Sequence, residues 1–149
     1  MLFRSEGSAE DWIEIYNAGS VSANLAGFGL SDESDQPFKW VFPATNLPPK
    51  SFLIVFASGK DRRTPGSALH ANFKLSLVGG PLLFTTAELV PQTLTQFKPK
   101  YPEQRNDYSY GLSADGQWRH FKTPTPGAAN GSSAIEGVTD APQIGRAHV

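Results

Sequence analysis

The stretch WIEIYN, residues 12–17, decides the fold of this chain. Ile13 and Ile15 are two positions apart, so an extended strand places both on one face, with Glu14 between them on the other. This alternation predicts a half-buried strand that ends at the polar turn NAGS, residues 17–20. The isoleucine face of such a strand needs a second apolar layer to cover it.

Short apolar runs, separated by glycine and proline, continue along the rest of the chain. The sequence contains 14 Gly and 12 Pro, and we find no convincing amphipathic helix. Further strands are expected at residues 25–30, 38–42, 52–57, 73–77, 82–84, 108–112 and 117–121. The pattern as a whole predicts an all-β sandwich.

The sequence also predicts where one strand lies in its sheet and how other strands connect. The continuous apolar run FLIVFA, residues 52–57, indicates a central strand with both faces covered. The dipeptides at 79–80 (GG) and 115–116 (DG) predict hairpin turns between the strands that flank them. Residues 85–107 give a weaker signal, and there we expect Val90, Leu94 and Phe97 to anchor a connection to the core.

Composition limits the chemistry that the chain can perform. Its 149 residues, 39% of them hydrophobic, suffice for one core. The absence of cysteine excludes disulfides, thiolate metal sites and a cysteine nucleophile. Near-equal numbers of basic residues (13) and acidic residues (14) disfavour a dedicated nucleic-acid binder, which needs a pronounced basic surface. No apolar run has the length needed to cross a bilayer.

Both ends of the chain resemble translated sequencing adaptors. Residues 2–5 (LFRS) match one adaptor and residues 144–149 (IGRAHV) match its counterpart. We therefore expect segments 1–5 and 144–149 to be artefacts, residues 6–130 to form the domain, and residues 131–143 to be a linker to a missing downstream module. Without Arg4 and Arg146 the basic residues fall from 13 to 11, so the net charge lies near −3.

Several motifs occur in the order that is found in a known family. They are residues 11–17, 27–32, 39–43, 55–61, 69–75, 109–111 and 123–130. Together they resemble the lamin tail domain in its bacterial, secreted form, over residues 11–130. The stretch 85–96 follows the family pattern poorly.

This resemblance implies an immunoglobulin-like β-sandwich and a non-catalytic role. Bacterial lamin tail domains are modules of large exported proteins, so the resemblance implies an extracellular or cell-surface location. It also implies that the domain spaces, anchors or docks neighbouring modules of the same polypeptide, without a cofactor. Its partners would be those modules, or a protein or polysaccharide at the cell surface.

An acidic loop offers a candidate calcium site. Asp32, Glu33 and Asp35 could supply oxygen ligands to Ca²⁺. Their spacing differs from that of the helix-loop-helix calcium motif. The simpler interpretation is a turn with solvated carboxylates.

A basic loop offers a candidate surface for a ligand or partner. Lys60, Arg62 and Arg63 could bind an acidic polysaccharide or another anionic partner. Asp61 interrupts the cluster, so a solvated loop of mixed charge is the alternative.

Histidine and aromatic residues allow two further hypotheses. We expect no catalytic role for His70 or His120, because the sequence shows no accompanying nucleophile or metal-ligand motif. Trp40, Trp118, Tyr108 and Tyr110 could form a platform that stacks on sugar rings, or could fill a core. Burial of Trp40 or Trp118 would favour a scaffold over a polysaccharide-binding module, which is the alternative function.

The resemblance also predicts a gap at the start of the domain. Lamin tail domains usually carry a strand before the position of Asp11, and we expect truncation to have removed it here. An absent strand leaves backbone groups of its neighbour unpaired. We therefore expect a polypeptide extended upstream to melt at a higher temperature and to aggregate less. Equal melting temperatures for the two polypeptides would contradict this.

Overall fold

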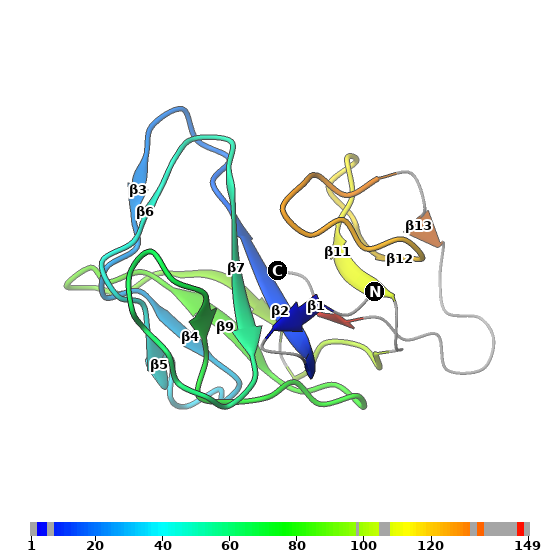
Figure 1. Ribbon diagram of the computed structural model, residues 1–149, viewed down its shortest axis with the longest axis horizontal. Helices are drawn as coiled ribbons and strands as arrows, with labels where there is room; N and C mark the ends of the chain where they lie inside the picture. The colour runs from blue at the N-terminus through cyan, green and yellow to red at the C-terminus, as the bar shows by residue number, and fades with distance from the viewer. Residues whose placement is uncertain are drawn as a thin grey trace.

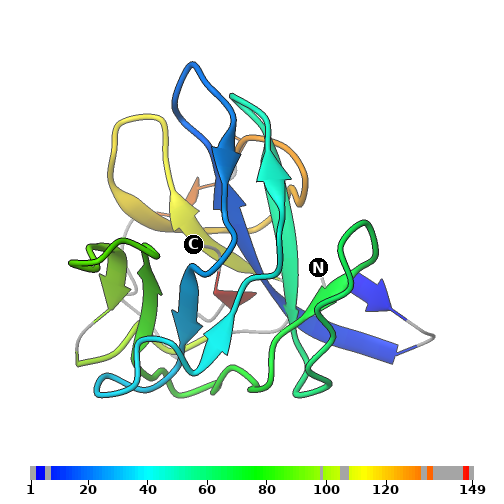
Figure 2. The same ribbon diagram turned by 90° about the vertical axis from the view of Figure 1, so that its left-hand side faces the viewer.

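A computed structural model describes residues 3–5, 8–97, 99–104, 108–131, 134–135 and 146–147 (Figures 1 and 2). These residues contain strands and no helix, so none of them belongs to a helix that could span a membrane. The strands are β1 (Phe3–Ser5), β2 (Ser8–Tyr16), β3 (Ala23–Asn24), β4 (Gly29–Ser31), β5 (Trp40–Val41), β6 (Asn46–Leu47), β7 (Phe52–Ala57), β8 (Leu69–His70), β9 (Leu82–Thr85), β10 (Thr93–Phe97), β11 (Ser109–Leu112), β12 (Trp118–Phe121), β13 (Ala134–Ile135) and β14 (Arg146–Ala147).

The strands form two packed sheets and a third sheet beside them. The first sheet has the order β1-β2-β7-β8 and the second has the order β10-β9-β4-β5. A third sheet, β13-β12-β11-β14, contains the hairpin that is drawn in yellow and orange in Figure 1, to one side of β2 and β7. Strands β3 and β6 form a separate pair. The predicted all-β sandwich is confirmed.

One hydrophobic core joins the first two sheets. Ile13 and Ile15 of β2 are both buried in it, as the alternation in WIEIYN predicts. The other fully buried members are Leu25, Leu30, Trp40, Phe42, Leu47, Val55, Ala57, Leu69, Ala71, Phe73, Leu82, Phe84 and Tyr101. Because these residues come from both sheets, each sheet covers the apolar face of the other.

The opposite face of β2 is buried as well, and this differs from the expected half-buried strand. Trp12 is fully buried, and the Glu14 side chain is only 1% exposed. Oε2 of Glu14 accepts a hydrogen bond from the backbone N–H of Gly127 at 2.5 Å. Gly127 lies in a turn closed by the bond from the N–H of Ala128 to the carbonyl of Thr125. The C-terminal turn is therefore tied to the N-terminal strand.

Strand β7 occupies the inner position predicted for it. It pairs with β2 in antiparallel fashion and with β8 in parallel fashion. Only Val55 and Ala57 are fully buried, while its other side chains are half-buried. Both faces are therefore covered, one of them only in part.

The strand predicted at residues 73–77 is absent, although Phe73 enters the core. Strand β9, its expected hairpin partner, already pairs with β4 on one edge and β10 on the other. The segment is held by Tyr101 instead, whose hydroxyl accepts a hydrogen bond from the N–H of Ser76 at 2.8 Å. At Gly79 a Cβ would lie 2.1 Å from the Tyr101 carbonyl oxygen, so glycine is needed there for close approach rather than for a hairpin.

The weakly predicted region 85–107 contains the edge strand β10. It pairs with β9 through a register irregularity between Thr93 and Thr95, so Leu94 occupies a β-bulge. Of the three expected anchors, Phe97 packs against the core, while Val90 and Leu94 are exposed. The hairpin predicted at 115–116 is confirmed, since β11 and β12 pair across it.

Short strands lie in the terminal segments. Strand β1 pairs with the first part of β2, so a strand does precede Asp11, and β13 pairs with β12 inside the expected linker. Strand β14 lies within 144–149 and pairs with β11. Most of the linker lies outside the described residues. The artefactual origin of the ends remains a prediction.

The Glu14 tie can be tested by substitution. In Glu14→Ala, the backbone N–H of Gly127 loses a charged acceptor, in a hydrogen bond that is partly buried. We expect the free energy of unfolding to fall by about 1–3 kcal/mol in urea denaturation, with a smaller loss for Glu14→Gln, which keeps an acceptor oxygen. Glu88→Ala, at an exposed position, serves as the control and should change stability by less than about 0.5 kcal/mol. Equal losses for Glu14→Ala and Glu88→Ala would contradict the tie.

Candidate functional site

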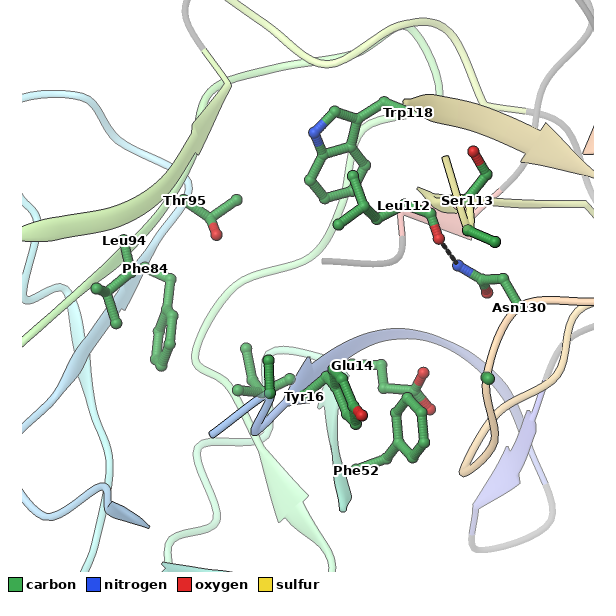
Figure 3. A pocket seen from close by; sticks show the side chains of 14 residues that line it. Glu14, Tyr16, Phe52, Phe84, Leu94, Thr95, Leu112, Ser113, Trp118 and Asn130 are labelled. Carbon is green, nitrogen blue, oxygen red and sulfur yellow. Dashed lines mark hydrogen bonds between the residues drawn. The ribbon is translucent and has the colours of Figure 1, made fainter. Parts of the chain in front are cut away.

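An apolar groove of about 480 Å³ opens between β2, β10 and the β11–β12 hairpin (Figure 3). Its apolar lining includes Tyr16, Phe52, Phe84, Leu94, Leu112 and Trp118, and its polar lining includes Glu14, Thr95, Ser113 and Asn130. In Figure 3, Phe84 and Leu94 face Leu112 and Trp118 across the opening, and Tyr16 and Phe52 lie below them in this view. A mostly apolar cavity with a few polar groups is the usual form of a binding site.

Aromatic contacts hold the walls of the groove. The rings of Tyr16 and Phe52 stack with centroids 4.6 Å apart. Trp118 stacks on Tyr110 at 5.7 Å and meets the edge of Phe97 at 4.9 Å. The first contact lies within the first sheet, while the contact of Trp118 with Phe97 joins the third sheet to the second.

The rim of the groove leaves apolar surface in contact with water. Leu94 is 55% exposed and Leu112 is 49% exposed. Both side chains line the groove, so a partner that enters it would cover them. Removing apolar surface from water is favourable by roughly 25 cal/mol per Å².

Asn130 gives the groove one unsatisfied acceptor. Its Nδ2 donates a hydrogen bond to the carbonyl of Leu112 at 2.7 Å, which fixes the orientation of the amide. Its Oδ1 is buried and accepts no hydrogen bond from any described atom. A buried acceptor without a donor is costly, so a ligand with an N–H or O–H group would gain by supplying one.

The predicted basic surface is largely neutralised. Nζ of Lys60 lies 2.5 Å from Oε1 of Glu10, and Nε of Arg63 lies 2.7 Å from Oδ1 of Asp61. The guanidinium of Arg63 also lies over the Trp40 ring, at 5.7 Å.

Arg62 and Arg63 line a second cavity. This cavity, of about 530 Å³, is also lined by Thr64, Ser67 and His70. The structure therefore brings two of the three predicted cations to one cavity, while Lys60 binds Glu10.

His70 is part of a structural cluster and lacks the geometry of a catalytic triad. Its Nδ1 lies 2.9 Å from Oγ of Ser58 and 3.5 Å from Oε2 of Glu10. In a Ser-His-acid triad the hydroxyl and the carboxylate bind opposite nitrogens of the imidazole, whereas here both approach the same nitrogen. Burial lowers the pKa of His70, and the nearby Glu10 carboxylate partly opposes that effect. The ring also stacks on Phe56 with centroids 5.1 Å apart.

His120 lies in a different sheet from His70. It is buried on β12, where Nε2 lies 3.4 Å from the carbonyl of Glu103. Burial lowers its pKa. The two histidines therefore do not form one site.

The acidic loop binds a lysine of this chain. Nζ of Lys39 donates hydrogen bonds to Oδ1 of Asp32 at 2.8 Å and to Oε1 of Glu33 at 2.6 Å, which raise the pKa of Lys39. Asp35 is exposed. Within the described ranges, no three acidic or histidine side chains are grouped as metal ligands. Calcium binding remains a prediction, and the ion would have to displace Lys39.

The four aromatic residues considered as a sugar platform do not share one exposed surface. Trp40 is fully buried, and its Nε1 donates a hydrogen bond to Asp61 at 3.1 Å. Tyr108, Tyr110 and Trp118 are half-buried. The burial of Trp40 favours the scaffold over the polysaccharide-binding module.

The groove was not identified from the sequence, although Trp118 had been considered as part of a sugar platform and Leu94 as a core anchor. Glu14 and Asn130 each carried a signal, because a carboxylate lies in the middle of an apolar strand and an asparagine ends the motif at residues 123–130. Leu94 and Leu112 carried none that distinguishes them from core residues. The groove depends on packing between segments far apart in the chain.

The burial of His70 and His120 predicts how stability depends on pH. Their folded pKa values lie below the ordinary 6.5, so the unfolded chain takes up protons first as the pH falls. We therefore expect the melting temperature to decrease between about pH 7.5 and about pH 5, with the histidine contribution fully present above the unfolded pKa. Calorimetry measures this decrease, and an NMR titration should give both histidines midpoints below 6.5. A midpoint above that value for either histidine would contradict the prediction.

Comparison with known proteins places the chain in a family. The family model described as Lamin Tail Domain matches residues 3–108, which include β1 to β10. No curated protein and no solved structure matches the chain. The match begins and ends earlier than the motifs at residues 11–130 suggested, and the immunoglobulin-like sandwich of the family agrees with the two packed sheets. The chain belongs to the lamin tail domain family.

Proposed function

We propose that this domain is a non-catalytic docking module that holds or spaces neighbouring modules of a large exported bacterial protein. The observation that carries this proposal is the open apolar groove, with Leu94 and Leu112 half in water at its rim. Exposed apolar surface around a cavity marks interaction sites. Membership of a family of interaction domains supports the same conclusion.

The polar clusters support a structural role for the domain. Glu14 binds Gly127, and the ring of His70 is held by Ser58 and Phe56. Asp61 receives hydrogen bonds from Trp40 and Arg63. Groups with such partners stabilise the fold and hold its loops in place.

A second candidate function is binding of an acidic polysaccharide at the cell surface. It is favoured by one observation, the cavity lined by Arg62 and Arg63 with the hydroxyl groups of Thr64 and Ser67. Oligogalacturonate is a suitable probe, because its carboxylates match the guanidinium geometry. Saturable binding that is lost in Arg62→Ala would favour this function over docking.

The docking function can be tested with the complete parent protein. Hydrogen exchange of this domain would be compared in the parent protein and in the separate 149-residue chain. We expect neighbouring modules to slow exchange on this domain by about tenfold or more at the contact, since docking there removes apolar surface from water. Identical exchange at every residue would contradict docking by neighbouring modules.

A further inference from the structure

We infer that the apolar groove binds an extended, apolar segment of a neighbouring module, which lies in it as an added β-strand. This inference rests on the proposed docking function and specifies what the groove recognises. Strand addition uses main-chain hydrogen bonds for affinity and cavities for alternate side chains. Three features of the groove fit this mode.

The first feature is an edge strand along the groove. Strand β10 is the last strand of the second sheet, and in the described part of the chain only β9 pairs with it. Leu94 and Thr95 of β10 line the groove. An unpaired strand edge is a template for another strand.

The bulge at Leu94 turns apolar surface toward the groove. The register irregularity between Thr93 and Thr95 lets two neighbouring residues, Leu94 and Thr95, line the same cavity. Bulges commonly re-aim side chains next to binding sites. After the bulge, residues 95–97 of β10 pair with β9 in regular register.

The second feature is the unsatisfied amide oxygen of Asn130. Its Oδ1 is buried and accepts no hydrogen bond from the residues that the structure describes, and its Nδ2 is committed to the carbonyl of Leu112. The amide therefore cannot rotate to offer a donor without breaking that bond. The oxygen can accept a hydrogen bond from an N–H or O–H group, which a polypeptide carries at nearly every residue.

The third feature is that the chain already places an extended segment next to the groove. Strand β14 pairs in parallel with Ser109 and Tyr110 of β11, and it also contacts β2. Two residues further along β11, Leu112 lines the groove. Both edges of β11 are paired, with β12 and with β14, so an added strand in the groove would pair with β10. Strand β14 shows that an extended backbone packs next to this wall of the groove.

The chemistry of the walls identifies the side chains of the occupant. The groove presents Tyr16, Leu94, Leu112 and Trp118. Among its described lining residues Glu14 alone is charged, and Glu14 is buried. A segment with apolar residues at every second position would place them in the groove and its polar residues in solvent. β-branched residues fit such a pleated surface best.

The test uses the 149-residue chain and a blocked synthetic peptide, Lys-Val-Thr-Val-Thr-Val-Lys, labelled for fluorescence anisotropy. We expect saturable binding that Leu94→Lys and Leu112→Lys each weaken by about tenfold or more, because a cation enters an apolar contact. Val78→Lys is the matched control, since Val78 is 63% exposed and lies outside the groove lining. It should change the affinity by less than about twofold.

A second peptide tests strand pairing without any change to the protein. The same sequence with N-methyl groups on alternate residues keeps the side chains and loses main-chain donors. We expect the affinity of this peptide to be lower by about tenfold or more, because ladder hydrogen bonds cannot form. Equal affinity of the two peptides would overturn strand addition, and so would a failure of the first peptide to saturate at millimolar concentration.

Two other outcomes would also overturn the inference. Light scattering that shows a dimer, which Leu112→Lys dissociates, would assign the groove to a second copy of the chain. Equal binding by Leu112→Lys and Val78→Lys would place the peptide elsewhere. The exchange experiment on the parent protein separates this inference from the docking function. Slowed exchange away from the groove would retain docking and overturn only this inference, whereas identical exchange at every residue would contradict docking itself.

Discussion

The burial of β2 on both faces is the constraint on which the rest of the structure depends. Ile13 and Ile15 close the core between the first two sheets, while Trp12 and Glu14 on the other face are also removed from water. A buried carboxylate needs hydrogen-bond donors. The N–H of Gly127 supplies one across 113 residues of chain, so the C-terminal turn is held against the first sheet. Because the turn is held there, Asn130, which follows it in the chain, lies in the wall of the groove.

Local periodicity was sufficient to predict strands such as β2 and β7, which pair with each other. The alternation at Ile13 and Ile15 and the apolar run at β7 both lie where the sequence predicted strands, because a period of two residues determines which side chains share a face. The same reasoning failed at residues 73–77. Their alternation is equally regular, but both edges of β9 are already occupied by β4 and β10. Strand pairing depends on which edges remain available, and periodicity carries no information about that.

The candidate site was harder to predict for a related reason. Lys60, Arg62 and Arg63 are close in sequence and predicted a basic surface, yet Glu10 and Asp61 bind two of these cations. Glu14 was expected on a half-buried strand and is instead enclosed. Each outcome depends on a partner from another part of the fold. The groove is the extreme case, because Leu94 and Leu112 become a site only when β10 and β11 are placed on opposite sides of it.

A groove of this kind is well suited to a partner on the same polypeptide. Apolar walls and one acceptor give modest affinity and limited discrimination between sequences, since main-chain hydrogen bonds are common to all segments. For a free ligand that would be a weakness. For a tethered neighbour it suffices, because a short linker raises the effective concentration to roughly millimolar, and a contact with a dissociation constant well below that remains mostly formed. The same weakness allows the contact to open when the neighbouring modules are pulled apart, so a module of this design can act both as a dock and as a spacer.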